Sequence, residues 1–205
     1  MSTKNSIVDK RIIKSKIALK ESLLSLMQNK DFKAITITDI VQLADLNRGT
    51  FYKHYHYKEE LLNEIIEDVV ADLIISYREP YKQVKKFVIR ELNSSAVKIF
   101  EHVEKHSSFY TLIVKSNVLY GFQNRICIEL KRLALEDLSN IYTNTNNKID
   151  NNLLASYTSY AILGMMIEWV KEGFQHSSSY MAEQLIEILN TAPVKITYRT
   201  NPISE

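Results

Sequence analysis

The chain has 205 residues, of which 45% are hydrophobic and 24% are charged, with only four glycines and three prolines. This composition excludes a disordered chain and favours long helices with few tight turns. No stretch has the unbroken apolar length expected of a transmembrane helix, and the first residues lack the apolar core of a signal peptide. Cys127 is the only cysteine, so it cannot form an internal disulfide, and we expect a cytoplasmic protein.

The formal net charge is +2, and its distribution along the chain is uneven. Residues 1–60 carry 11 Lys and Arg against 7 Asp and Glu, whereas residues 61–205 carry 15 against 17. A local basic excess is the electrostatic footprint of a phosphate-binding surface. Without a motif in the same region, an ordinary solvated surface would be the preferred explanation.

Residues 1–8 read as a frayed tail, and residues 9–28 as an amphipathic helix. Its apolar positions recur at helical spacing: Ile13, Ile17, Leu24 and Met27. Basic side chains follow the same helix, among them Lys10, Arg11 and Lys14. These three can contact the DNA backbone or simply be solvated, and the sequence leaves both readings open.

Residues 36–58 predict two short helices joined by a tight turn. Thr36 is a favourable N-cap, and Asp39 three residues later completes a pattern like a capping box. Asp45 stands where the first helix must stop and tolerates the left-handed conformation. Asn47 is a second N-cap, and Arg48 opens the following helix. The segment therefore predicts a helix-turn-helix whose second helix reads the major groove of DNA.

Further helices are expected over residues 58–78, 82–105, 109–114, 119–142, 150–175 and 180–190. The whole reads as an all-α protein of about nine helices, with no strand pattern. We expect a helix-turn-helix DNA-binding domain over residues 1–60. The helix over 58–79 links it to a second helical domain over 80–205. The helix over 150–175 is apolar around most of its circumference, so we expect one side to face the core and another a second subunit.

The helix-turn-helix segment resembles the tetracycline-repressor (TetR) family. The matching features are Thr36, Ile40, Ala44, Gly49-Thr50-Phe51-Tyr52, His54, Tyr55 and Lys58-Glu59-Glu60-Leu61-Leu62. Asp45 departs from the family's turn glycine, and Tyr57 from a small polar cap. The order of elements is similar over nearly the whole chain. The resemblance implies that the last two helices of each subunit form a four-helix dimer interface, and that the helices before them enclose an inducer pocket.

The candidate DNA-contacting residues lie within the helix-turn-helix: Thr36, Thr38, Arg48, Gly49, Thr50, Tyr52, Lys53, His54 and Lys58. By resemblance, Tyr52, His54 and Lys58 touch the backbone. Arg48 is the best candidate for specificity, because a guanidinium bonds bidentately to guanine. Tyr52 could instead pack in the core, and His54 could cap locally. Two heads about 34–36 Å apart would read a near-palindromic operator in double-stranded DNA.

Aromatic and Met side chains of the second domain are candidates to line the pocket of an unidentified small-molecule effector: Phe100, Phe109, Tyr110, Phe122, Tyr157, Tyr160, Met165 and Trp169. Taken singly, each is more often simple core than part of a ligand pocket. Candidates for the homodimer interface come from the last two predicted helices: Leu163, Gly164, Ile167, Met181, Leu185 and Ile188. Gly164 would allow a close approach of two helices.

His102 and His106 lie four residues apart and could face one side of a helix, but no third metal ligand is evident at suitable spacing. We therefore predict no metal and no cofactor. An enzyme is not expected, because the sequence has no phosphate-binding glycine loop and no nucleophile motif. The prediction is a DNA-binding transcriptional regulator, more specifically a repressor released by an effector. The alternative is a helical small-molecule-binding or partner-binding protein that does not read an operator.

Overall fold

The computed structural model describes residues 2–79, 94, 97–115, 121–141 and 149–191, and within these ranges all regular secondary structure is helical. The head contains α1 (Ser2–Met27), the short 3-10 helix η1 (Phe32–Ala34), α2 (Ile37–Leu43) and α3 (Arg48–Tyr52). Next comes α4 (Lys58–Arg78). The rest of the described chain contains α5 (Ile99–Lys105), α6 (Ser107–Lys115), α7 (Phe122–Ile141), α8 (Asn151–Lys171) and α9 (Ser178–Asn190). The all-α fold class is confirmed.

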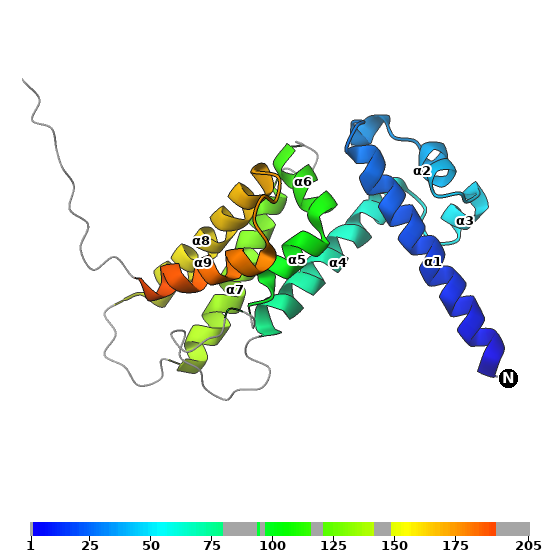
Figure 1. Cartoon of the computed structure of the whole chain (residues 1–205). Helices are drawn as coiled ribbons and strands as arrows, with labels where there is room; N and C mark the ends of the chain where they lie inside the picture. The colour runs from blue at the N-terminus through cyan, green and yellow to red at the C-terminus, as the bar shows by residue number, and fades with distance from the viewer. Residues whose placement is uncertain (1, 80–93, 95–96, 116–120, 142–148, 192–205) are drawn as a thin grey trace, which may run out of the picture.

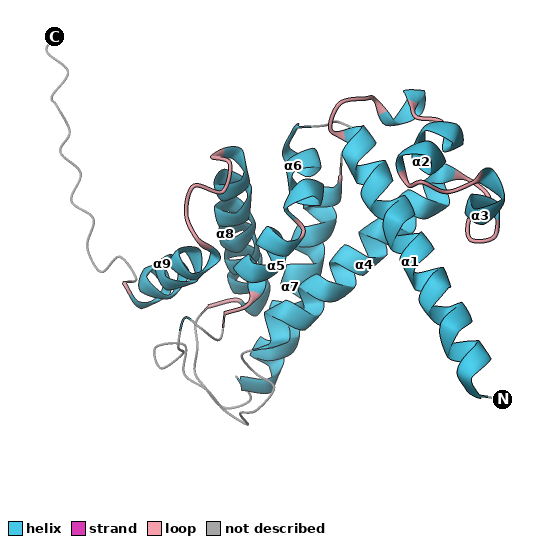
Figure 2. Cartoon of the chain, turned by 45° about the vertical axis from the view of Figure 1, so that its right-hand side comes forward, coloured by secondary structure: helices cyan, strands magenta, loops and turns pink. Residues whose placement is uncertain are grey.

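The two ends of the molecule are formed by different parts of the chain. Figures 1 and 2 show α2 and α3 at one end and α8 and α9 at the other, with α4 running from the head into the helices of the second region. The head also touches that region through α1, since the Gln28 side-chain amide donates to the Ser108 carbonyl at 2.9 Å. One continuous apolar cluster extends from Leu19 to Ile186.

Local sequence signals shape the helix-turn-helix as predicted. Thr36 and Asp39 form a capping box at the start of α2, with both hydrogen bonds present. At its end, the Leu46 amide bonds to the Val41 carbonyl at 2.8 Å and the Asp45 amide to the Gln42 carbonyl at 3.2 Å. This pair of bonds is a Schellman motif, which needs a left-handed residue, and Asp45 has a φ of 52°.

The N-terminal helix differs from the expectation in two ways. It begins at Ser2, so the predicted tail over residues 1–8 is wrong from Ser2 onward. No glycine or proline interrupts residues 2–27, and nothing in the backbone chemistry stops the helix. Ile13 and Ile17 are exposed rather than inward, because the N-terminal half of α1 extends past the rest of the head (Figure 1). The buried side chains come later in the helix, at Leu19, Leu23 and Met27.

The predicted continuous helix over residues 82–105 is also wrong where the structure describes it. Val97 and Lys98 are not helical, and α5 begins at Ile99; residues 80–93 and 95–96 lie outside the described residues. In one straight helix, positions 97 and 99 would point about 200° apart. Both side chains are buried here, which the turn before α5 makes possible.

The acidic face of α4 binds cations from other helices. Glu64 accepts from the Lys16 and Lys20 ammonium groups at 2.8 and 2.6 Å, and Asp68 also accepts from Lys20 at 2.6 Å. Surface pairs of this kind contribute little stability each. These pairs direct Lys16 and Lys20 toward α4, so the two ammonium groups do not face a ligand that binds the helix-turn-helix.

The turn after α8 explains why Trp169 is buried. The Phe174 amide bonds to the Trp169 carbonyl and the Gly173 amide to the Val170 carbonyl, both at 3.0 Å, with Gly173 at a φ of 72°. This second Schellman motif brings the rings of Trp169 and Phe174 to 5.0 Å in an edge-to-face contact. The Trp169 indole N–H donates to the His176 carbonyl at 3.0 Å.

One apolar face of α8 is largely exposed in the part of the chain that the structure describes. Leu153, Tyr157 and Tyr160 are 70%, 70% and 63% exposed, and Gly164 is exposed on the same side. Their spacing of four, three and four residues places them on one helical face. Within the described residues, α8 is the one helix long and apolar enough to cross a bilayer by length and composition. Its opposite face packs into the core through Ile162, Met166 and Trp169, as in core helices, which pass the same test.

Candidate nucleic-acid interface

The helix α3 is short, and both of its ends are held by bonds within the head. The Asn47 side-chain oxygen accepts from the Thr50 amide at 2.8 Å and so caps the start of the helix. Phe51 is fully buried, with its ring 5.7 Å from that of Tyr55, which is also buried. One side of α3 is thereby fixed to the core, and the opposite side is presented to solvent.

Arg48 and Tyr52 lie next to each other on the exposed side of α3. The Arg48 guanidinium donates to the Tyr52 hydroxyl at 3.3 Å and lies 5.9 Å from the centre of its ring. Tyr52 is 49% exposed and contacts the buried Phe51 edge-to-face at 5.7 Å. The hydroxyl and the ring of Tyr52 therefore restrict the position of the Arg48 guanidinium. A held guanidinium loses less side-chain freedom when it binds a base edge or a phosphate.

Gly49 and Thr50 complete the first turn of α3. Gly49 is exposed, and a Cβ at this position would lie 3.2 Å from the Asn47 side-chain oxygen, which is tight against the cap. The Thr50 hydroxyl donates to the same oxygen at 3.1 Å. This leaves the oxygen of Thr50 to accept and its methyl group to make apolar contacts.

Thr36, Thr38 and Lys53 are all exposed. Thr38 follows the cap of α2, and Lys53 is the C-cap of α3. The Thr36 hydroxyl is already used by the Asp39 amide at 3.1 Å. Lys53 is therefore an accessible cation at the C-terminal end of α3, whereas the Thr36 hydroxyl is used by the fold.

The Lys58 ammonium does not have the surface role that we expected. It donates to the carbonyls of Phe32 and Ile35, each at 2.7 Å, and to that of Lys33 at 3.2 Å. It also lies 4.6 Å from the centre of the Phe32 ring. An ammonium has three protons, and three carbonyl acceptors use all of them. In this conformation Lys58 ties α4 to η1 and has no proton left for a phosphate.

His54 is similarly engaged inside the head, but through a partner on α1 that is distant in sequence and not through the local cap offered as the alternative. Its Nε2 lies 3.0 Å from the hydroxyl of Ser15 on α1, and that hydroxyl donates to the Ile12 carbonyl at 2.9 Å. The ring therefore donates its Nε2 proton to Ser15. Burial, together with the nearby Lys16 charge, lowers the pKa of His54, which disfavours the cationic form that would suit a phosphate.

Two further features of the head agree with the sequence analysis. Tyr57 caps α4 without a side-chain hydrogen bond, as its sequence suggested. Lys10, Arg11 and Lys14, which the sequence left open as backbone contacts, are exposed on the N-terminal half of α1. Exposed basic side chains of this kind, together with Arg48 and Lys53, are suited to phosphate contacts that supply affinity for a polyanion.

The predicted pocket residues separate into two groups. Phe100, Phe109, Tyr110, Phe122 and Trp169 are buried together, with ring contacts such as Phe109 to Phe122 at 4.9 Å, and Met165 is half-buried. Tyr157 and Tyr160 lie instead on the exposed face of α8. A cavity of about 430 Å³ lies elsewhere, between α4 and α5, and none of the eight predicted residues lines it.

The predicted dimer residues are also divided. Gly164 and Ile188 are exposed, and Ile167 is half-buried. Leu163, Met181 and Leu185 are buried within the chain, where they pack in its own core. The exposed apolar residues of α8 that the prediction missed as interface candidates are Leu153, Tyr157 and Tyr160. An all-round apolar helix gives no sequence signal for which side faces the core.

Comparisons with known proteins identify the two regions separately. A family model described as bacterial regulatory proteins of the tetR family matches residues 21–65. A second, described as the C-terminal region of a transcriptional regulator, matches residues 90–191. The matched segments contain the helix-turn-helix and helices α5 to α9.

Relatives and solved structures agree with these matches. The chain is 26% identical over 194 residues to the uncharacterized HTH-type transcriptional regulator YxbF of Bacillus subtilis, covering 94% of this chain and 49% of the relative. It is 32% identical over 124 residues to DhaS, the dhaKLM operon activator of Lactococcus lactis, covering 58% and 63%. The chain thus spans about half the length of the first relative and 63% of the second.

Among solved structures, a TetR transcriptional regulator from Streptococcus agalactiae shares the fold at 24% identity, with a TM-score of 0.56 and coverage of 90% and 98% of the two chains. A regulator described as putative TetR-family from Syntrophomonas wolfei superposes with a TM-score of 0.62 at 19% identity, covering 89% and 96%. The helix-turn-helix, the helical second region and both family models lead to one conclusion: the chain belongs to the TetR family of bacterial transcriptional regulators.

Proposed function

We propose that this chain is a homodimeric, cytoplasmic DNA-binding regulator that reads a near-palindromic operator with α3. The observation that supports this function is the exposed Arg48–Tyr52 pair on a capped helix whose other face is buried. Arg48 would bond a guanine edge, while Lys53, Tyr52, Thr38 and the N-terminal turn of α3 would hold the backbone. The domain division follows, with residues 1–60 as the reading head and residues 80–205 as the dimerisation and effector domain.

The dimer is proposed from the uncovered face of α8. Leu153, Tyr157 and Tyr160 form an exposed apolar row that continues to Gly164, and Ile188 on α9 is 56% exposed. Contiguous apolar surface of this kind marks an interaction site. A two-fold axis would pair α8 and α9 with the same helices of a second copy, and Gly164 would let the backbones approach closely. Two heads then bind two half-sites, which a single head would bind weakly.

Control by an effector would act through α4, the helix that joins the head to the second region. A ligand that binds one arrangement of α4 more tightly shifts the population toward it and changes the distance between the two heads. We propose that DNA binding represses transcription and that the effector releases the protein. The L. lactis relative is named as an activator, so a reporter gene placed behind the operator decides the direction of control.

The test is DNA binding to fragments of the promoter region of the protein's own gene and of its neighbours. Arg48→Ala should weaken binding by about 1–3 kcal/mol and relax specificity at one base position. Arg125→Ala is the matched control, because Arg125 is also exposed but lies on α7 and pairs with Glu67 of α4 at 2.7 Å. If wild-type protein shows no specific, salt-sensitive binding to any of these fragments, the alternative of a binding protein without operator reading is correct.

A further inference from the structure

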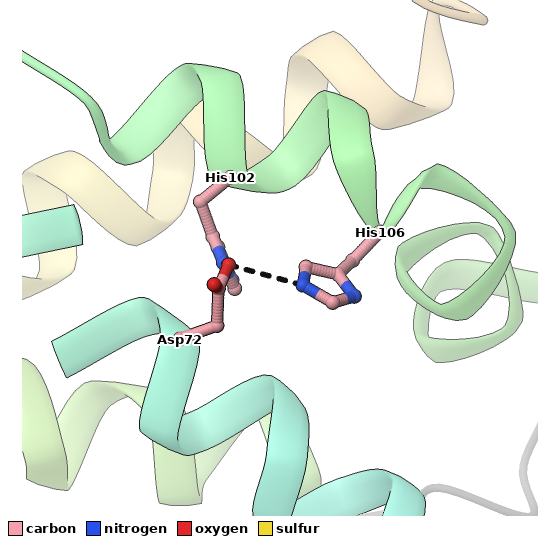
Figure 3. A group of neighbouring side chains, drawn as sticks. All are labelled: Asp72, His102 and His106. Atoms are coloured by element: carbon pink, nitrogen blue, oxygen red, sulfur yellow. Dashed lines mark hydrogen bonds and ion pairs between the residues drawn. The ribbon is translucent and has the colours of Figure 1, made fainter. Parts of the chain in front are cut away.

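Three side chains from two helices meet at the junction between α4 and α5. Asp72 lies on α4, and His102 and His106 lie one turn apart at the C-terminal end of α5 (Figure 3). One carboxylate oxygen of Asp72 is 2.7 Å from His102 Nδ1 and 3.1 Å from His106 Nε2. The two imidazole rings are 4.7 Å apart between centres, and all three candidate ligand atoms lie within 4.8 Å of one another.

The His102 ring has a second hydrogen-bond partner, an arrangement that is typical of a metal ligand. Its second nitrogen, Nε2, lies 2.8 Å from the hydroxyl of Tyr110, which is buried. Ligating histidines usually donate their other N–H to an oxygen that fixes the orientation of the ring. Tyr110 can accept such a proton from Nε2 when Nδ1 carries a metal, so the same pair serves both tautomers.

From this geometry we propose that Asp72, His102 and His106 form a binding site for a divalent transition-metal cation of the zinc class. Two imidazole nitrogens and one carboxylate oxygen are a donor set that such cations prefer. In a tetrahedral site with bonds of about 2.0–2.1 Å, ligand atoms lie about 3.3 Å apart. The distances of 2.7 and 3.1 Å from Asp72 therefore need to widen by only a few tenths of an ångström.

The surroundings provide a route to the site and a fourth position. Asp72, His102 and Lys105 line the cavity of about 430 Å³, so a cation can enter and water can complete its coordination. Lys105 donates to the second Asp72 oxygen at 2.8 Å and opposes a bound cation, but its side chain is 63% exposed and can turn toward solvent. Bound metal would join α4 directly to α5.

The competing explanation is a purely structural hydrogen-bond cluster, in which Asp72 receives protons from both histidines. That arrangement satisfies the same atoms without a cation and is common for buried histidines. The two explanations differ in one measurable property, since only a ligand site binds metal in a defined ratio to protein.

The experiment uses the full chain, freed of metal with a chelator, and needs no DNA, so its result does not depend on the proposed function. Co²⁺ alone is added and followed by its visible absorption, and Zn²⁺ is then added as competitor. We expect saturation at one Co²⁺ per chain, displacement by Zn²⁺, and a rise in the melting temperature with either metal. Failure to bind in a one-to-one ratio would overturn the proposal.

Variants locate the binding. His106→Gln and Asp72→Asn each keep a polar side chain of similar size and should weaken binding about tenfold or more. His176→Gln is the control, because His176 lies in the turn between α8 and α9 and stacks on Tyr180. Circular dichroism establishes whether each variant is folded. If one of the two ligand variants does not fold, the other is enough for the test. Binding that is unchanged in the folded ligand variants, or lost in His176→Gln, would place the metal elsewhere and overturn the proposal.

Discussion

The head and the second region each expose tyrosine side chains on a helix, but in different surroundings. Tyr52 on α3 is 49% exposed, and its neighbours are Arg48 and the buried Phe51. Tyr157 on α8 is 70% exposed, and its neighbours along the face are Leu153 and Tyr160. An aromatic ring beside a guanidinium suits a charged, wet ligand such as DNA, whereas one in an apolar row suits a dry interface.

The difference shows that exposure alone does not assign a role. Both rings expose apolar surface to water, which is unfavourable. The Tyr52 ring packs on the buried Phe51 and its hydroxyl meets a guanidinium, whereas the neighbours of Tyr157 along its face are Leu153 and Tyr160. The surrounding residues on the same helix face decide which partner fits. The following changes test that distinction, from the largest expected effect to the smallest.

Tyr157→Glu should break the dimer. Each copy would carry an uncompensated charge into the apolar face, at a cost of about 3–5 kcal/mol per buried charge, and two-fold symmetry counts that cost twice. Sedimentation equilibrium should show the mass of a monomer. Tyr52→Glu is the matched control and should keep the mass of the dimer. Equal masses for Tyr157→Glu and wild type would exclude this face as the interface.

Phe51→Ala should destabilise the head by about 3–5 kcal/mol, because it removes a fully buried aromatic ring and leaves a cavity. Urea unfolding followed by circular dichroism measures the loss. Tyr52→Ala, at the next position, removes a ring that is half exposed and should cost clearly less. If the two losses are equal, the assignment of one face of α3 to the core and the other to DNA is wrong.

Lys58→Met should lower the free energy of unfolding by about 1–3 kcal/mol, since it leaves the carbonyls of η1 without their charged donor. The salt dependence of DNA binding should stay the same. Lys53→Met provides the contrast: stability should be unchanged, and the slope of log affinity against log salt should fall by about one phosphate contact. If Lys58→Met instead lowered the salt slope and left stability unchanged, Lys58 would be a contact to the DNA backbone.

The smallest effect concerns Asp39 in the capping box. The Lys30 ammonium, with help from Thr36, lowers the pKa of Asp39 to about 2 in the folded protein. A lowered carboxyl pKa means stability that is present above the unfolded pKa near 3.8 and lost as pH falls toward 2. The difference in urea midpoint between wild type and Asp39→Asn should therefore shrink as pH falls from 5 to 2.

A second variant separates the causes of that acid dependence. Lys30→Met removes the ammonium group that lies 2.7 Å from Asp39 and lowers its pKa most. This substitution should make the stability of the protein less dependent on acid pH. An acid dependence that is the same with and without Lys30 would leave the Thr36 backbone bond as the only important partner.

The accuracy of the sequence-based predictions depended on how far apart the interacting residues lie. The caps at Thr36 and Asn47 and the left-handed turn at Asp45 were predicted, because each involves neighbours within a few residues. The role of Lys58 was not, since its acceptors lie 23 to 26 positions earlier in the chain. Asp72 was missed as a partner of the two histidines for the same reason, being 30 positions from His102.

The sequence by itself determined the helical fold class, the helix-turn-helix and the position of α3, because helix periodicity and capping act over a few residues. Only the tertiary structure decided which face of α8 is covered by the chain, since an all-round apolar helix has no preferred side until its neighbours pack. It also decided that Lys58 and His54 serve the interior of the head, and that a carboxylate from α4 meets two imidazoles from α5. Those outcomes depend on the packing of distant helices, which no local pattern records.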